Sequence, residues 1–114
     1  MAGDAFNTIT LFWQIQNDRD YTRLVKLFAD DAVLEDPIYG RFEGREAIGE
    51  FMAKMNEATE AANMHFDALE IAGDDHTAWC RWVARSPKGD RNGVGIYKVA
   101  NSKLTFYQDF IESA

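Results

Sequence analysis

Cysteine is nearly absent from this sequence of 114 residues, and proline is rare. The single Cys80 cannot form an internal disulfide, and no cysteine or histidine cluster has the spacing of a zinc site, so we expect no metal. The two prolines form no proline-rich linker. The length and a hydrophobic content of 46% suffice for a packed core without disulfides or a structural metal, so we expect one domain over residues 1–114.

Basic residues are also scarce: 12 lysines and arginines face 19 acidic residues, for a net charge of −7. This balance weakens attraction to nucleic acid and to anionic membranes, which we exclude as partners. No apolar run approaches the ~18 residues of a membrane span, and Met1–Asp4 lacks the basic and apolar regions of a signal peptide. We therefore expect a cytoplasmic protein. The spaced glycines from Gly89 to Gly95 precede no helix, so no nucleotide site is evident and no cofactor is expected.

Apolar residues recur at steps of three to four in the first half of the chain and predict three helices. Asp4 and Asp20 are the expected N-caps of the first two. The predicted helices run from Asp4 to about Asn17, from Asp20 to Phe28, and from Arg45 to about Ala58. A short strand over Ala32–Asp36 precedes the third helix, and a loop with two glycines joins them.

In the second half of the chain the apolar residues no longer recur with the helical period. This half is rich in aromatic and β-branched residues, which favours strands. The predicted strands are Met64–Ala72, Thr77–Arg85, Asn92–Val99 and Lys103–Glu112. Short turns join them, so an antiparallel meander is the simplest topology. Helices followed by a run of strands are typical of an α+β fold in which helices cover one face of the sheet.

The last strand places large groups on both faces. Alternation puts Tyr107 and Asp109 on one face, and Phe106 and Phe110 on the other. One face would meet the helices. The other would leave a wide apolar surface in water, which favours a homodimer through the outer sheet face.

Two segments, Phe28–Pro37 and Gly44–Ile48, resemble the ketosteroid isomerase and SnoaL-like polyketide cyclase superfamily of the nuclear-transport-factor-2-like (NTF2-like) class. With a terminal strand such as Lys103–Phe110, the resemblance covers nearly the whole chain. It implies a cystatin-like, cone-shaped fold, in which a curved antiparallel sheet wraps around the N-terminal helices. It also implies that a cavity at the open end of the cone holds a small hydrophobic molecule.

The resemblance gives Asp36 the position of the carboxylate that shuttles a proton in ketosteroid isomerases. Those enzymes also bind the enolate oxygen with a tyrosine and a protonated aspartate, and these positions hold Phe12 and Gly95 here. Loss of both donors removes the stabilisation that usually dominates such chemistry, which argues against a steroid isomerase. Asp36 is equally consistent with a turn residue that binds backbone amides before Pro37.

Asp109 is the second candidate, because Tyr107–Phe110 resembles the Trp-Arg-Asp-Tyr stretch of limonene epoxide hydrolases. The Arg-x-Asp motif of these enzymes would fall on Arg81–Val83, which keeps the arginine and loses the carboxylate. Arg81 could then pair with Asp109 in the pocket or form a surface ion pair. Alternation separates Trp79 from Trp82 but does not show which of them is internal.

Two acids in one apolar cone would raise each other's pKa, and a protonated and an ionised carboxyl together make a general acid and base. We therefore expect a cofactor-independent isomerase, cyclase or epoxide hydrolase with Asp36 and Asp109 as its catalytic residues. The expected substrate-binding residues are Tyr107, Arg81, Tyr97, Tyr39, Phe12 and Trp79, although each aromatic could be a core residue. The alternative is a ligand-binding or dimerisation domain of the same fold without catalysis.

Overall fold

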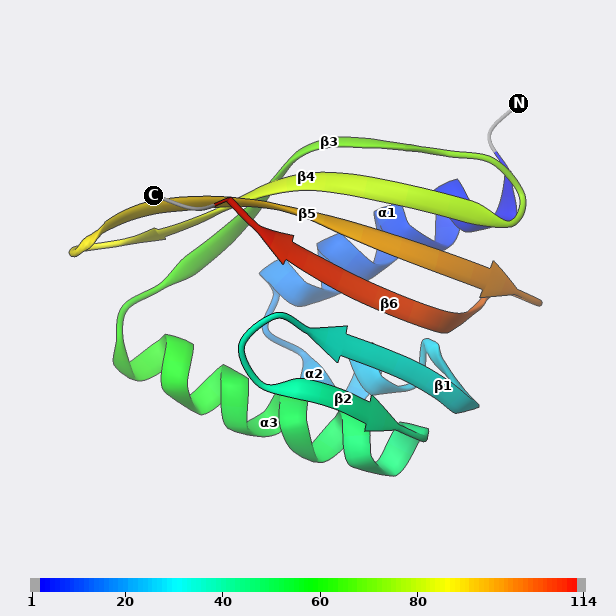
Figure 1. Cartoon of the computed structure of the whole chain (residues 1–114), viewed down its shortest axis with the longest axis horizontal. Coiled ribbons are helices and arrows are strands. Elements are labelled where there is room, and N and C mark those ends of the chain that lie inside the picture. Colours follow the sequence, from blue (N-terminus) through cyan, green and yellow to red (C-terminus); the bar gives the residue numbers. More distant parts are fainter. Residues whose placement is uncertain (1–2, 113–114) are drawn as a thin grey trace.

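The computed structural model describes residues 3–112 and has the predicted α+β architecture (Figure 1). The helices are α1 (Asp4–Asn17), α2 (Tyr21–Val25) and α3 (Arg45–Ala61). The strands are β1 (Phe28–Asp36), β2 (Gly40–Glu43), β3 (His65–Gly73), β4 (Thr77–Ser86), β5 (Gly89–Ala100) and β6 (Lys103–Ile111). No helix within the described residues is both long and apolar enough to cross a membrane.

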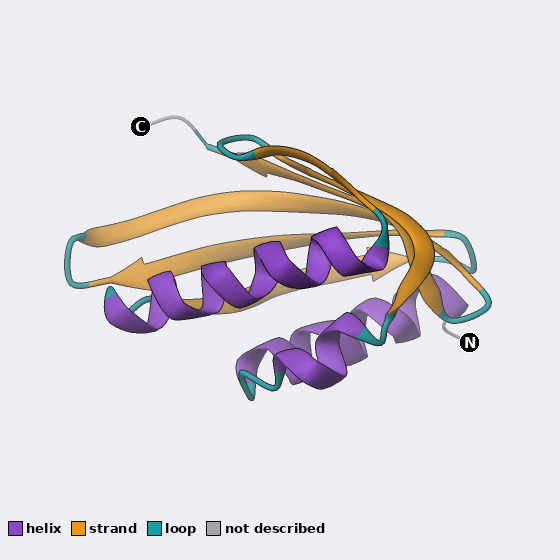
Figure 2. Ribbon diagram, turned by 90° about the horizontal axis from the view of Figure 1, so that it is seen from below, coloured by secondary structure: helices purple, strands orange, loops and turns teal. Residues whose placement is uncertain are grey.

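All six strands form one sheet in the order β2-β1-β6-β5-β4-β3. The last four strands form the predicted antiparallel meander. β1 adds to β6 in parallel and pairs with β2 in an antiparallel hairpin. The sheet curves around the helices, which lie on its concave face, so the cone-shaped fold is confirmed (Figure 2).

α1 has the predicted length, but its cap differs from the prediction. The N-cap residue is Gly3, and Asp4 is the first helical residue. The Asp4 carboxylate instead accepts hydrogen bonds from the backbone N–H of Ser102 at 2.9 Å and from its hydroxyl at 2.6 Å. Asp4 thereby fixes the turn between β5 and β6 to the start of α1.

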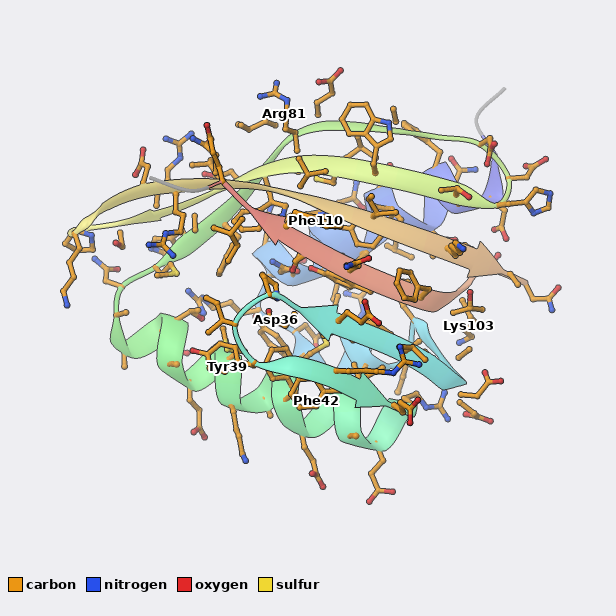
Figure 3. The ribbon with its side chains drawn as sticks, viewed as in Figure 1. Asp36, Tyr39, Phe42, Arg81, Lys103 and Phe110 are labelled. Carbon is orange, nitrogen blue, oxygen red and sulfur yellow. The ribbon has the colours of Figure 1, made fainter. Side chains whose placement is uncertain are left out.

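The second helix is shorter than the predicted span from Asp20 to Phe28. Asp20 caps α2 as expected, accepting a hydrogen bond from the Arg23 N–H at 3.3 Å, but α2 stops at Val25. Phe28 starts β1 and is fully buried against Phe12 of α1, with ring centroids 6.1 Å apart. The expected loop before α3 also contains the short strand β2. Its Phe42 stacks on Phe51 of α3 at 4.4 Å, which holds the β1–β2 hairpin against that helix (Figure 3).

Candidate functional site

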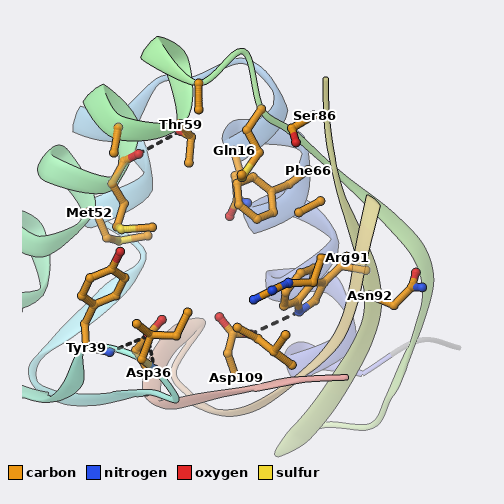
Figure 4. A pocket seen from close by; sticks show the side chains of 18 of the residues that line it. Gln16, Asp36, Tyr39, Met52, Thr59, Phe66, Ser86, Arg91, Asn92 and Asp109 are labelled. Atoms are coloured by element: carbon orange, nitrogen blue, oxygen red, sulfur yellow. Dashed lines mark hydrogen bonds between the residues drawn. The ribbon is translucent and has the colours of Figure 1, made fainter. Parts of the chain in front are cut away.

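A cavity of about 810 Å³ lies between α3 and the concave face of the sheet (Figure 4). This volume falls in the range of small-molecule sites. Most of its walls are apolar. The apolar side chains include Leu34, Phe51, Met52, Met55, Met64, Phe66, Trp82, Ala84 and Ile111. Flexible methionine side chains can adapt such a wall to the shape of a ligand.

Asp109 enters this cavity from β6. Strand alternation turns Tyr107, Asp109 and Ile111 toward the helices, and all three line the cavity. The Trp82 indole N–H donates a hydrogen bond to Asp109 Oδ1 at 3.3 Å. Desolvation raises the pKa of Asp109 from 3.8 to about 7, and the charge of Asp36 adds to the rise. Hydrogen bonds from Tyr107 and Trp82 oppose it in part. Asp109 therefore exchanges a proton close to neutral pH.

A buried polar network lies beneath Asp109. Tyr97 is fully buried, and its hydroxyl accepts a hydrogen bond from the Trp13 indole N–H at 3.2 Å. Gly95 is the cross-strand partner of Asp109, and a Cβ at this position would lie 2.8 Å from Tyr97 Cζ and 3.0 Å from Asp109 Oδ1. Only glycine leaves room for both groups. Burial raises the pKa of Tyr97 and of Tyr107, so both hydroxyls stay protonated and can donate.

Asp36 is a turn residue, as one of the two interpretations of the sequence expected, and it also lines the cavity. Its Oδ1 accepts hydrogen bonds from the backbone N–H groups of Ile38 at 2.8 Å and Tyr39 at 2.9 Å, as a turn residue does. The half-buried residue also lines the same cavity as Asp109. Figure 4 shows both carboxylates along one side of the cavity. The structure therefore brings the two predicted acids to one hollow.

Four of the six expected substrate-binding residues do not line the cavity, and two of these four lie on the opposite face of the sheet. Arg81 and Trp79 project from the convex face of β4, because the inward positions of that strand are taken by Cys80 and Trp82. Arg81 forms a surface ion pair with Glu70 at 3.4 Å, so it is no partner of Asp109 (Figure 3). The prediction that Arg81 and Trp79 bind substrate is therefore wrong, because side-chain alternation along β4 places both on the face away from the cavity.

The other four expected substrate-binding residues differ in how deeply they are buried. Phe12 and Tyr97 are fully buried in the aromatic core, 5.9 Å apart between ring centroids, and do not line the cavity. Tyr107 is 7% exposed and lines it. Tyr39 is 56% exposed at the cavity mouth, where its ring lies against Phe51.

Trp82 is the tryptophan of the candidate site, which the sequence could not distinguish from Trp79. It lines the cavity and is the one indole that donates to Asp109 among the hydrogen bonds of residues 3–112. A Cβ on its cross-strand partner Gly93 would lie 2.6 Å from Trp82 Cε2. A glycine opposite a large ring indicates which tryptophan points inward. This indication can be used only once the register between β4 and β5 is known, and the sequence alone does not give that register.

A further titratable group next to the site is the thiol of Cys80. The described residues contain no group of three or more histidine, cysteine, aspartate or glutamate side chains arranged to hold a metal ion. Burial, with a contribution from Asp109, raises the pKa of Cys80 to about 12, so its thiolate is scarce at neutral pH. The chemistry available is proton transfer by carboxyl groups, with hydroxyl and indole donors beside them.

The sequence signature of the SnoaL-like domain matches residues 9–107. The chain belongs to this family. No curated protein sequence matches it. Solved structures show that this SnoaL-like domain has the NTF2-like fold. A candidate ketosteroid isomerase from Kribbella flavida superposes with a TM-score of 0.84 at 17% identity, covering 97% of this chain and 79% of the other.

Two further structures resemble the SnoaL-like domain over most of both chains. An NTF2-like protein of unknown function from Mesorhizobium loti gives a TM-score of 0.82 at 20% identity, covering 96% of this chain and 92% of the other. A candidate polyketide cyclase from Sinorhizobium meliloti gives 0.76 at 22% identity, covering 91% and 94%. At these identities the likeness establishes the fold, while the activity has to be argued from the site.

Proposed function

We propose that this SnoaL-like domain is a cofactor-independent acid/base enzyme that acts on a small hydrophobic molecule as an isomerase, a cyclase or an epoxide hydrolase. One observation carries the proposal: Asp109 lies in an apolar cavity with a pKa of about 7, beside indole and hydroxyl donors. An acid or base is most effective when its pKa lies near the working pH, because both protonation states are then populated.

The roles follow from the surroundings of each group. Asp109 takes a proton from the substrate or gives one to it. Tyr107, which stays protonated, donates a hydrogen bond to an oxygen that gains charge during the reaction. Asp36 lines the same cavity and supplies the second carboxylate that epoxide hydrolysis or a two-step proton transfer requires. The candidate isomerase and the candidate cyclase among the structural neighbours agree with this chemistry.

A screen of hydrophobic lactones, epoxides and ketones by thermal shift, followed by turnover assays on the hits, tests the proposal. Asp109→Asn and Asp36→Asn should each lower kcat by at least about 100-fold and leave the melting temperature nearly unchanged or raised. Glu70→Gln is the matched control, since its carboxylate lies on the convex face. Hits that bind but turn over in no assay support a ligand-binding domain instead. Variants that keep full activity refute the catalytic roles of Asp109 and Asp36.

The convex face of the sheet supports a second proposal, a homodimer. Trp79 and Phe110 are 37% and 46% exposed there, and their cross-strand partners are the apolar Ile96 and Val94. An apolar strip of this kind is costly in water and favours a partner surface. Sedimentation equilibrium should show a dimer for the native chain and a monomer for Trp79→Glu. A monomeric native chain at micromolar concentration contradicts the proposal.

A further inference from the structure

The end of the cavity beside the β4–β5 hairpin differs chemically from its apolar walls. Its lining there is polar and charged: Ser86, Lys88, Asp90, Arg91 and Asn92. The two candidate catalytic carboxylates enter from β6 and from the end of β1. A molecule that fills this cavity therefore meets the two candidate carboxylates on one side and a mixed set of acidic and basic side chains, among them Arg91, at the hairpin.

Arg91 projects into the cavity because of its place on β5. Alternation puts it on the concave face with Gly93 and Gly95, and its cross-strand partner is the small Ala84. No large side chain at these positions blocks the guanidinium. Figure 4 shows it extending from β5 into the hollow. The residue is exposed, so its charge sits where the cavity meets water.

The charge of Arg91 is not neutralised by the described part of the chain. The ion pairs within residues 3–112 use Arg41, Arg45, Arg81 and Arg85 instead. The neighbouring Asp90 is held by Arg85 at 3.4 Å.

Lys88 also lacks an ion pair within residues 3–112, and Glu112 is the acidic residue that lines this end beside Asp90. Arg85 is shared between Asp67 at 3.0 Å and Asp90 at 3.4 Å, so acidic and basic groups around the hairpin are close to balance. Arg91 and Lys88 are nevertheless the cations of the cavity lining that no carboxylate within residues 3–112 holds in an ion pair. Two cationic side chains without a carboxylate partner favour an anionic group at this end of the cavity.

We propose that Arg91 binds the carboxylate of an amphipathic acid whose apolar part fills the cavity. The inference rests on the proposed function and gives its substrate class. A guanidinium binds a carboxylate through two parallel hydrogen bonds, which fixes orientation as well as charge. Gly95 is the cross-strand partner of Asp109, and Arg91 lies four residues before it on β5. Arg91 and the strand position of Asp109 are therefore about 13 Å apart along the strand. The headgroup thus stays near water while the apolar part reaches Asp109.

A matched pair of fluorescent probes tests this inference: 1-pyrenebutyrate, which is anionic, and 1-pyrenebutanol, which has the same ring and chain without charge. Titration at low salt should show the native protein binding the acid about 10-fold more tightly than the alcohol. Arg91→Gln should abolish that preference and leave binding of the alcohol unchanged. Arg81→Gln, a convex-face control, should keep it, and Arg91→Lys should keep part of it.

The outcomes separate the headgroup site from the catalytic proposal. Equal binding of both probes by the native protein, or a preference that survives Arg91→Gln, overturns the role of Arg91 and leaves the apolar cavity and Asp109 untouched. Binding of neither probe overturns the headgroup site together with a ligand-accepting cavity. Loss of turnover in Asp109→Asn with no change in probe preference supports catalysis independently.

Discussion

The raised pKa of Asp109 should make the protein less stable as pH rises through the neutral range. In the unfolded chain the carboxyl titrates near its ordinary value of 3.8, and in the folded state near 7. Between these values the folded state binds more protons than the unfolded state, so the free energy of unfolding falls with rising pH. The stabilising contribution is complete below about pH 4 and is lost as pH rises through 7.

The size of this effect follows from the two pKa values. The difference between 3.8 and about 7 corresponds to about 4 kcal/mol. Because the carboxylate faces a cavity that is open to solvent, screening reduces the loss to roughly 2 to 4 kcal/mol. Asp109→Asn removes the titration and keeps an oxygen to accept the Trp82 hydrogen bond. The variant should therefore match the native protein near pH 4 and exceed its stability by roughly 2 to 4 kcal/mol at pH 8.

Urea unfolding of both proteins from pH 4 to pH 8 measures this difference, and contributions from other carboxyls cancel in the comparison. NMR titration of the Asp109 carboxyl carbon gives the folded pKa directly. Glu70→Gln should change stability by less than about 1 kcal/mol at any of these pH values, since its ion pair is exposed. A stability difference for Asp109→Asn that does not vary with pH, or a carboxyl midpoint near 4, would refute the reasoning.

Three further predictions concern the surroundings of Asp109. Gly93→Ala should lower the free energy of unfolding by about 1 to 3 kcal/mol in urea, because the new methyl group meets the Trp82 ring; an unchanged midpoint contradicts this. Trp82→Phe removes a hydrogen bond that lowers the pKa of Asp109, so its NMR midpoint should rise above about 7. Asp36→Ala should lower the free energy of unfolding by about 1 kcal/mol, because two backbone N–H groups of the turn lose their acceptor, and Asp36→Asn should lower it less. An Asp36→Ala variant as stable as the native protein in urea would show that the turn bonds contribute nothing.

Most of the fold could be predicted because helices and strands occupy separate halves of the sequence with different periods. The four later strands and their turns are local patterns, and they were located within a few residues. The start of β1 could not be located in this way. Phe28 follows a helix and precedes two aspartates at Asp30 and Asp31, which look like a helix end. It belongs to a strand because β1 pairs in parallel with β6, at Leu104, more than seventy residues further along the chain.

The site depends on the same kind of long-range pairing. Alternation divides β4 into two faces, and nothing in its own residues decides whether Arg81 or Trp82 points inward. The choice is made by register, which sets Gly93 opposite Trp82 and Gly95 opposite Asp109. Each glycine leaves space where a Cβ would collide with the ring or the carboxylate of the site. The two alternate glycines of β5, one opposite an aromatic residue and the other opposite an acid, therefore make the room in which Trp82 and Asp109 reach the cavity.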